Sequence, residues 1–346
     1  MKVDAAKRET LFFSMTLEYL EKYMPMQLGR SKQTIKAHRD ALTVFRRFLN
    51  VDKNSSIGRF TFKECTPELI QDFILYLKDV GNSAATRNRR LCSLRSYVWF
   101  AADRDIALQS VALRMDKIPL CKEEKREKAV MSAEALSCLL HQPANTKMGL
   151  RDRTMMILLY DSAIRLDELL SMKVKDAVVQ SAEPYIRVFG KGSKERVVAV
   201  TEITANHLAE YIRAFHDCAT KSNQNLLFYT KIKGETGKMS EGNVERFIDQ
   251  YATQARKDCK EIPAKVYPHM FRRSRATELY QNGVELALIS KILGHSQIET
   301  TKIYAVPSLE MLRVAIESVE TLEQAAEQPL WESCSEEDMA RLCGIR

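Results

Sequence analysis

Residues 267–304 constrain this chain more than any other stretch, because four polar side chains recur there at spacings that suit one phosphate group. His269 and Arg272 are three positions apart, which puts both side chains on one face of a helix. His295 follows in a Leu-Gly-His-Ser turn, and Tyr304 comes after it. Together they offer a cation, two imidazoles and a phenol, which can stabilise charge, move protons and act as a nucleophile. The sequence therefore predicts a site for attack on a phosphodiester.

Helix start and stop signals around these residues predict the helices and turns on which they lie. Pro268 stands where a helix start tolerates proline, and Gly283 marks the end of that helix. A second helix is expected over residues 284–293, ended by Gly294. His295 is therefore expected to leave a helix end at a turn, with Tyr304 in a short helical segment beyond it.

Taken jointly, these motifs resemble the tyrosine recombinase (phage integrase) family, its Xer-like branch in particular. The resemblance implies that Tyr304 attacks a DNA phosphate and leaves a 3′-phosphotyrosyl bond and a free 5′-hydroxyl. It implies that Arg272 holds the phosphate, that His295 adds a hydrogen bond there, and that His269 is the general base or acid. The family also implies a catalytic arginine in an RxxEL motif, in which Glu-Leu begins three residues after the arginine, and Arg165 matches that position.

In the segment DSAIRLDEL, Arg165 and Glu168 are expected at the end of one long helix that starts near residue 151. From the residues alone, the pair is also compatible with an ordinary helix salt bridge. The resemblance makes Arg165 catalytic, with Glu168 orienting the cluster. In the family, a small residue and a glycine usually stand just before that arginine. Here they are Ser162 and Ala163, so the turn is expected to differ slightly in geometry from the family's turn.

A β-hairpin is predicted over residues 185–200, with Gly-Lys-Gly-Ser as its turn. A lysine between glycines is ordinarily a solvated turn residue. The pattern resembles the hairpin that carries the family's catalytic lysine, which implies that Lys191 protonates the departing 5′-oxygen. Lys194 and Arg196 are the next candidates, and both are also expected to contact DNA.

Charge is distributed unevenly along the chain. Residues 1–128 carry a net +9, residues 129–308 a net +5 and residues 309–346 a net −6. A basic body with an acidic tail indicates a polyanion partner. In the segment beginning near residue 83, Arg89 and Arg90 lie on a polar side with small serines, which would let a helix approach DNA, although a solvated helix face is an equal alternative. After Arg272, the family resemblance implies a histidine and an aromatic residue, and this chain has Arg273 and Arg275 instead. Their added charge is expected to strengthen DNA contacts.

The chain is expected to be mainly α-helical with a small β-hairpin or sheet (α+β), in two domains. The resemblance implies a C-shaped clamp, with a helical SAM-like core-binding domain over residues 1–120 and a catalytic domain over residues 131–307. The charged run around residues 121–130 is the expected linker. In the first domain, helices are expected over residues 12–20, 31–49, 66–77 and 83–103. In the second, helices are expected over residues 202–217 and 241–257, with a strand over residues 226–229 between them.

The tail, residues 308–346, is expected to form a helix over residues 308–327 and to dock on a neighbouring subunit. Leu330, Trp331, Met339 and Leu342 would make the contact. Folding back on the tail's own domain is the alternative.

Eight scattered cysteines without a CxxC pair indicate reduced thiols in a cytosolic protein. With no apolar run near eighteen residues and no basic-apolar leader, we expect a cytoplasmic, nucleoid-associated protein rather than a membrane protein. No metal and no nucleotide cofactor are expected, because arginines supply the charge and the phosphotyrosyl bond stores the energy for rejoining.

These expectations describe a site-specific DNA recombinase or integrase, expected to serve a mobile element and to exchange strands through a Holliday junction. Its partners would be double-stranded DNA sites and other copies of the chain, as a dimer on one site and a tetramer in the synapse. A type IB topoisomerase and a sequence-specific DNA-binding regulator are the alternatives.

Overall fold

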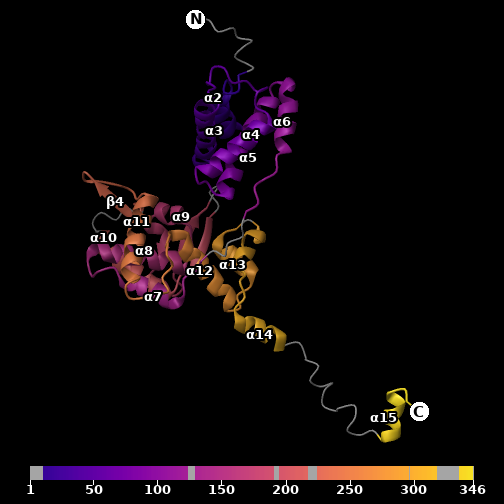
Figure 1. The fold of residues 1–346 in the computed structure, drawn as a ribbon. Helices are drawn as coiled ribbons and strands as arrows, with labels where there is room; N and C mark the ends of the chain where they lie inside the picture. Colours follow the sequence, from indigo (N-terminus) through magenta and orange to yellow (C-terminus); the bar gives the residue numbers. More distant parts are fainter. Residues whose placement is uncertain are drawn as a thin grey trace. The chain divides into compact units, whose positions relative to one another are not determined.

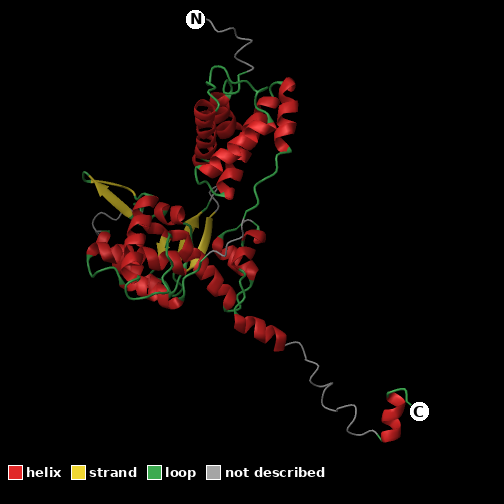
Figure 2. Cartoon of the chain, in the orientation of Figure 1, coloured by secondary structure: helices red, strands yellow, loops and turns green. Residues whose placement is uncertain are grey.

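The computed structural model describes residues 11–123, 129–190, 195–216, 224–295, 297–317 and 335–345. The chain divides into two compact units, Met1–Glu127 and Lys128–Arg346. Helices dominate both units, and the named strands belong to the second (Figures 1 and 2). The predicted mainly helical α+β class is therefore confirmed. The clamp shape of the two domains stays a prediction.

The first unit is a bundle of helices built on an aromatic core. Ser31, Thr66 and Ser83 each begin a helix as an N-cap, with the side-chain oxygen accepting the backbone N–H three residues later. Such caps contribute about 1 kcal/mol each. The helices are α2 (Thr16–Glu18), the π-helical η1 (Tyr19–Gln27), α3 (Lys32–Asp52), α4 (Pro67–Asp79), α5 (Ala84–Ala102), the 3-10 turn η2 (Ile106–Leu108) and α6 (Gln109–Asp116). The four predicted helices are present, and α6 is a further helix that was not expected.

Helix α5 contacts α3, α4 and α6, so it is buried on more sides than its sequence indicated. Ser93, expected on an open polar face, is buried and donates to the Arg89 carbonyl at 3.1 Å. Ser96 accepts a hydrogen bond from the Tyr19 hydroxyl at 2.8 Å. Ser96 therefore contacts η1 and Ser93 is buried, so neither serine lies on an open face, while the approach of α5 to DNA stays a prediction. Arg89 is exposed and Arg90 is half-buried.

The second unit packs helices around one large apolar cluster. Its helices are α7 (Ala133–His141), α8 (Lys147–Asp161), α9 (Leu166–Ser171), η3 (Val174–Asp176), α10 (Glu202–Phe215), α11 (Glu241–Ala255), α12 (Pro268–Gln281), α13 (Leu286–Leu293), η5 (Ile298–Thr300) and η6 (Lys302–Tyr304). Met155, Met156 and Leu159 of α8 lie in the centre of this cluster, as their apolar run predicts. Helices α10 and α12 both pack on α8.

A break after Asp161 separates α8 from α9, which corrects the single long helix expected here. Ala163 takes a left-handed conformation with φ +51°, which cannot continue a right-handed helix. Arg165 is consequently the N-cap of α9 rather than a residue at the end of a long helix. The break matters for the site, because it turns the backbone beside Arg165.

Two antiparallel sheets complete the second unit. The first has the order β1 (Ala177–Val178), β2 (Tyr185–Phe189) and β3 (Glu195–Ala199), and β2 pairs with β3 as the predicted hairpin. Ile186, Val188 and Val198 point into the core. The second is a hairpin of β4 (Tyr229–Ile232) and β5 (Glu235–Lys238), where only one strand at residues 226–229 was expected. Lys233 and Gly234 both have positive φ, as a tight primed turn between antiparallel strands requires.

The chain enters the second unit along α12, the helix that carries His269 and Arg272. The Met131 backbone N–H donates to the Ser274 hydroxyl at 2.8 Å, and Nη1 of Arg273 donates to the Ala129 carbonyl at 3.2 Å. The two residues that follow Arg272 therefore hold the start of this unit against the helix.

Two further helices lie in the tail, α14 (Leu309–Glu317) and α15 (Glu336–Leu342). Leu309, Val314 and Ile316 of α14 are exposed. The helix predicted to residue 327 is present as far as the structure describes it. Leu330 and Trp331, and the side chain of Leu342, lie outside the described residues, whereas Met339 is half-buried. Among the described helices, none combines the length and the apolar character needed to cross a membrane.

Candidate active site

The turn between α8 and α9 carries the first candidate, Arg165. Ala163 in this turn holds a left-handed φ of +51°, which costs a non-glycine residue about 1–2 kcal/mol. Its carbonyl accepts a hydrogen bond from Nη1 of Arg272 at 2.6 Å. Arg165 then begins α9, and its backbone N–H donates to Oε2 of Glu168 at 2.9 Å. An alanine thus adopts a shape that glycine adopts freely, and the turn links the two candidate arginines.

Glu168 is a buried carboxylate shared by two arginines. Arg165 donates from Nη1 to Oε1 at 2.9 Å. Arg196 makes two parallel hydrogen bonds, Nη1 to Oε1 at 3.1 Å and Nη2 to Oε2 at 2.8 Å. Burial raises the pKa of Glu168, but Arg196 and then the N–H and guanidinium of Arg165 lower it further, so the pKa lies below its usual value. The carboxylate is therefore ionised at neutral pH and holds both cations.

Arg272 on α12 is the most deeply buried cation of the cluster, with 1% of the residue exposed. Besides the Ala163 carbonyl, its guanidinium donates to the Leu293 carbonyl at 2.7 Å and to Nε2 of His295 at 3.0 Å. Its Nε has no hydrogen-bond partner among the described residues. Burial, followed by the charge of Arg165, lowers the pKa of Arg272 to about 10, so the side chain stays charged at neutral pH.

His295 leaves the end of α13 directly after Gly294, which caps that helix with φ +64°. Since a guanidinium only donates, Nε2 of His295 must accept from Arg272, and the ring proton must lie on Nδ1. Nδ1 then donates to the Thr301 hydroxyl at 2.9 Å. Burial, followed by the charges of Arg272 and Arg165, lowers the pKa of His295 to about 4. The imidazole is therefore neutral, with its Nε2 lone pair facing the arginine.

Tyr304 ends the short helix η6 and is 2% exposed. Its ring packs in a small cluster with Ala163, Ala276 and Leu293. It also stacks on His295, with ring centroids 6.1 Å apart and an angle of 18° between the planes. The phenol thus belongs to the same group of side chains as Arg272 and His295.

His269 lies at the beginning of α12 and is exposed. It lies close enough to His295 to contribute, after burial, Arg272 and Arg165, to the lowered pKa of His295. Lys191 and Lys194 lie outside the described residues. The predicted candidates Arg165, Glu168, His269, Arg272, His295 and Tyr304 are therefore brought together by α9, α12, α13 and η6.

Three arginines expected to contact DNA are held by protein groups. Arg196 is paired with Glu168, as described. Arg273 is 6% exposed and donates to Ala129 and to the Tyr267 hydroxyl. Arg275 pairs with Glu278 at 2.8 Å and with Asp161 at 3.4 Å. Each of the three therefore spends at least one of its nitrogens on protein acceptors, and DNA contact by them stays a prediction.

Three residues that sequence reasoning did not select complete the cluster. Ala163 and Leu293 supply the carbonyls that hold Arg272, and Thr301 accepts the hydrogen bond from Nδ1 of His295. Ala163 had a signal, since it occupies a position where a glycine was expected. Leu293 and Thr301 had none, because a backbone acceptor or a single hydroxyl leaves no mark on a sequence pattern.

The lowered pKa of His295 predicts a stability change with pH. An unfolded histidine binds a proton below about pH 6.5, whereas the folded ring does so only below about pH 4. Stability is therefore expected to fall as the pH drops from 6.5 to 4. The full shift corresponds to about 3 kcal/mol, and solvent screening of a half-buried ring reduces it to about 1–2 kcal/mol.

Denaturant unfolding at pH 7 and pH 4.5 measures this effect. His295→Gln should lose about 1–2 kcal/mol less between the two pH values than the wild type. His141→Gln, which changes an exposed histidine on α7, is the matched control and should follow the wild type. Equal pH dependence in His295→Gln and the wild type would show that His295 titrates normally.

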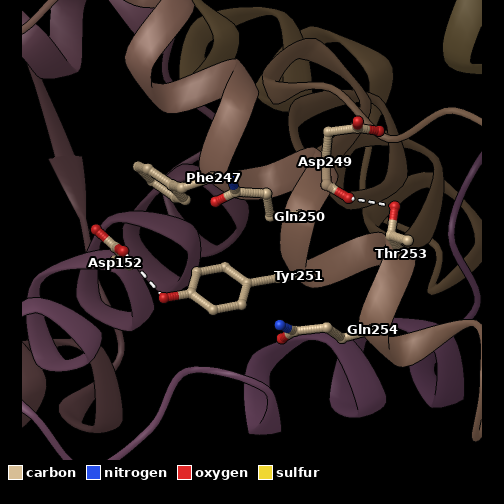
Figure 3. Close-up of a pocket in the computed structure, with 7 residues that line it drawn as sticks. All are labelled: Asp152, Phe247, Asp249, Gln250, Tyr251, Thr253 and Gln254. Carbon is tan, nitrogen blue, oxygen red and sulfur yellow. Dashed lines mark hydrogen bonds between the residues drawn. The ribbon is translucent and has the colours of Figure 1, made fainter.

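A separate hollow of about 580 Å³ lies on α11 and is lined by Asp152, Phe247, Asp249, Gln250, Tyr251, Thr253 and Gln254 (Figure 3). Two of its polar groups are paired within the hollow: the Tyr251 hydroxyl donates to Asp152 at 3.0 Å and the Thr253 hydroxyl to the Asp249 carbonyl at 2.8 Å. None of the predicted site residues lines it. The chemistry therefore lies in the Arg272 cluster rather than in this hollow.

The chain is similar in sequence to known protein families and to known proteins. Residues 129–310 match the Phage integrase family, and residues 17–105 match the Phage integrase, N-terminal SAM-like domain. Tyrosine recombinase XerD of Staphylococcus epidermidis is 30% identical over 297 residues, covering 86% of this chain and 95% of that protein. Tyrosine recombinase XerD of Oceanobacillus iheyensis is 27% identical over 285 residues, covering 82% and 90%.

Solved structures show the same fold. The Tn1549 transposon integrase in complex with transposon right end DNA is similar with a TM-score of 0.67 at 16% identity, over 88% of this chain and 99% of that one. The XerH site-specific recombinase bound to its difH substrate is similar with a TM-score of 0.60 at 21% identity, over 86% and 83%. The predicted resemblance is confirmed: the chain belongs to the phage integrase family and is a tyrosine recombinase, an enzyme that cleaves DNA and exchanges its strands.

Proposed function

We propose that this enzyme is a site-specific recombinase of a mobile element, which cuts and rejoins two DNA sites through 3′-phosphotyrosyl and Holliday-junction intermediates. The observation that carries the proposal is the environment of Arg272. In the described part of the chain, its hydrogen bonds go to two carbonyls and an imidazole, and none goes to a carboxylate. A buried cation is costly without an anion, so a phosphate beside it is strongly favoured.

The charge balance of the cluster supports the same ligand class. Arg165, Arg196 and Arg272 contribute three positive charges, and Glu168 contributes one negative charge. A DNA phosphodiester carries one negative charge in its ground state and gains another as a nucleophile attacks. Arg165, with 43% of its side chain exposed, and Arg272 would bind the non-bridging oxygens and stabilise that growing charge.

The reaction would proceed by two balanced transfers. The Tyr304 oxygen attacks phosphorus, the bond from phosphorus to the 5′-oxygen breaks, and the phenol proton passes to His269 as general base. Lys191 gives a proton to the departing 5′-oxygen. In the second transfer, a 5′-hydroxyl of the partner duplex attacks phosphorus and gives its proton to Lys191, the bond from phosphorus to the Tyr304 oxygen breaks, and His269 returns the proton to that oxygen. The energy of the diester is kept, so the strands rejoin without a nucleotide cofactor.

His295 needs a rearrangement before it can donate to the phosphate. Its Nε2 accepts from Arg272, and its proton is held by Thr301. A phosphate that takes over the Arg272 donors would free Nε2, and protonation there would turn His295 into a donor. Its role as a hydrogen-bond donor in the transition state therefore belongs to the DNA-bound enzyme.

The rest of the chain would serve DNA and assembly. We infer that residues 1–120 form the core-binding domain, that the linker over residues 121–130 joins it to the catalytic domain over residues 131–307, and that the tail over residues 308–346 docks on a neighbouring subunit. Arg89, exposed on α5, Arg90 and Lys194 would contact DNA. Relatives with solved structures include an integrase on transposon-end DNA and a recombinase on its substrate site, which supports a mobile-element role and a duplex DNA partner.

A plasmid assay tests the function. DNA from either side of the gene that encodes the chain is cloned into a supercoiled plasmid, and the parent plasmid is the control. The expected result is recombinant plasmids joined at one sequence, which identifies the site. Equal relaxation of both plasmids would support a type IB topoisomerase, and binding without cleavage would support a DNA-binding regulator.

A further inference from the structure

Arg196 stands at the junction of three elements of the catalytic unit. It belongs to β3 and lies opposite Val188 of β2 in the hairpin register. Its side chain is 15% exposed and reaches away from the hairpin to α9 and to the end of α13. A residue of the hairpin is thereby tied to the parts of the chain that carry Arg165 and His295.

On the α9 side, Arg196 binds Glu168 with the two parallel hydrogen bonds of 3.1 and 2.8 Å. The Glu168 side chain is 6% exposed, and it also holds the backbone N–H and the guanidinium of Arg165. A planar guanidinium matches a carboxylate in this two-pronged way, which a lysine ammonium cannot do. The position of Glu168, and through it of Arg165, therefore depends on Arg196.

On the α13 side, Arg196 donates from Nε to the Ile292 carbonyl at 3.3 Å. Arg272 holds the next carbonyl, that of Leu293, at 2.7 Å. The last carbonyls of a helix have no partner within the helix and carry its negative dipole end, so cations bind there favourably. Two guanidiniums thus donate hydrogen bonds to consecutive carbonyls at the end of α13, directly before His295.

Gly294 leaves the space that the Arg196 guanidinium occupies. A Cβ at this position would lie 2.9 Å from Cζ, Nε and Nη1 of Arg196, closer than such atoms approach. The glycine also takes the left-handed φ of +64° that ends α13. The Arg196 guanidinium therefore lies flat against the backbone immediately before His295.

We propose that Arg196 is a positioning residue of the recombination reaction: it holds Arg165 through Glu168 and the His295 turn through the Ile292 carbonyl. The inference rests on the proposed function, because it needs Arg165 and His295 to act on a phosphate. In this role Arg196 acts through other residues: its Nε and one N–H of each terminal nitrogen donate to protein acceptors, and its side chain is 15% exposed. This role differs from the direct DNA contact that a basic hairpin residue would otherwise indicate.

Arg196→Lys is the variant of choice, because it keeps the charge and loses the two-pronged geometry. Arg187→Lys, on the neighbouring strand opposite Val197, is the matched control. Single-turnover cleavage and binding are measured on a nicked duplex that carries the site recovered by the plasmid assay. A second duplex carries a methylphosphonate at the cleaved position, which removes one negative charge from the phosphate.

For a positioning residue, Arg196→Lys should cleave the ordinary duplex about 10–100-fold more slowly, with the Kd and its salt dependence unchanged. On the methylphosphonate duplex the difference from the wild type should shrink at least about fivefold, since less charge remains for a displaced Arg165 to stabilise. Arg187→Lys should match the wild type on both duplexes.

Several outcomes would overturn the inference. A weaker Kd with a salt slope reduced by about one would make Arg196 a phosphate contact. Normal cleavage, or a cleavage defect of equal size on both duplexes that follows a lowered Tm, would leave Arg196 with a purely structural role. If the wild type itself cleaves neither the recovered site nor its flanking DNA, the proposed function fails first, and this inference fails with it.

Discussion

Tyr304→Phe should abolish the covalent protein–DNA adduct while the Kd for the site changes by less than about twofold. The substitution removes one hydroxyl and leaves the ring that packs on Ala163 and Leu293 and stacks on His295. The basic surface that binds the phosphates is unchanged, so affinity persists. The chemical step has no other route, because the attacking oxygen is gone. A denaturing gel with a nicked suicide duplex detects the adduct, and a mobility shift measures the Kd.

Tyr280→Phe is the matched control, since Tyr280 packs against the same small cluster as Tyr304. It should form the adduct at nearly the wild-type rate. A protein–DNA band that persists in Tyr304→Phe would assign the nucleophile to another residue and remove the centre of the proposed mechanism.

Arg272→Lys should slow cleavage by about three orders of magnitude, even though the charge is kept. The guanidinium of Arg272 spans the Ala163 and Leu293 carbonyls and Nε2 of His295 at once. A lysine ammonium is a single point on a flexible stem, so it cannot hold all three and still face a phosphate. Single-turnover cleavage gives the rate, and a mobility shift with a thermal melt shows whether the variant binds DNA and folds.

Arg275→Lys tests whether any arginine of α12 would behave in the same way. Arg275 pairs with Glu278 and Asp161, and neither belongs to the Arg272 cluster. We expect its cleavage rate to stay within about threefold of the wild type. If both variants lost cleavage rate to a similar extent, α12 would need its arginines for packing. The proposal that Arg272 acts on the phosphate would then lose its support.

Local sequence signals explain why much of the fold could be predicted. The N-caps at Ser31, Thr66 and Ser83 act on backbone groups three residues away, so a short window contains the whole interaction. Gly283 and Gly294 end helices by adopting positive φ, which is a property of the residue itself. Residues at i and i+3 of a helix share a face, which is why His269 and Arg272 could be assigned to one site.

The break between α8 and α9 shows where local signals fail. The residues on both sides favour a helix, and Ala163 has no preference for a left-handed conformation. Packing decides the matter: the turn directs the Ala163 carbonyl to Arg272, which is 109 residues further along the chain. No window of the sequence contains both partners, so the helix appeared continuous.

Residue types at short, fixed spacings were enough to predict the family, the helical class and most members of the Arg272 cluster. The hydrogen bonds and charge states of those side chains could be seen only in the folded chain. From the sequence, Arg196 is expected on the surface. In the structure it binds Glu168, which lies 28 residues earlier in the chain, and only 15% of its side chain is exposed. The neutral state of His295 likewise follows from burial beside Arg272 and Arg165. Both features depend on burial and on Coulomb interactions, which act through space. The separation of two residues in the sequence does not give their distance in the fold, so neither feature could be predicted.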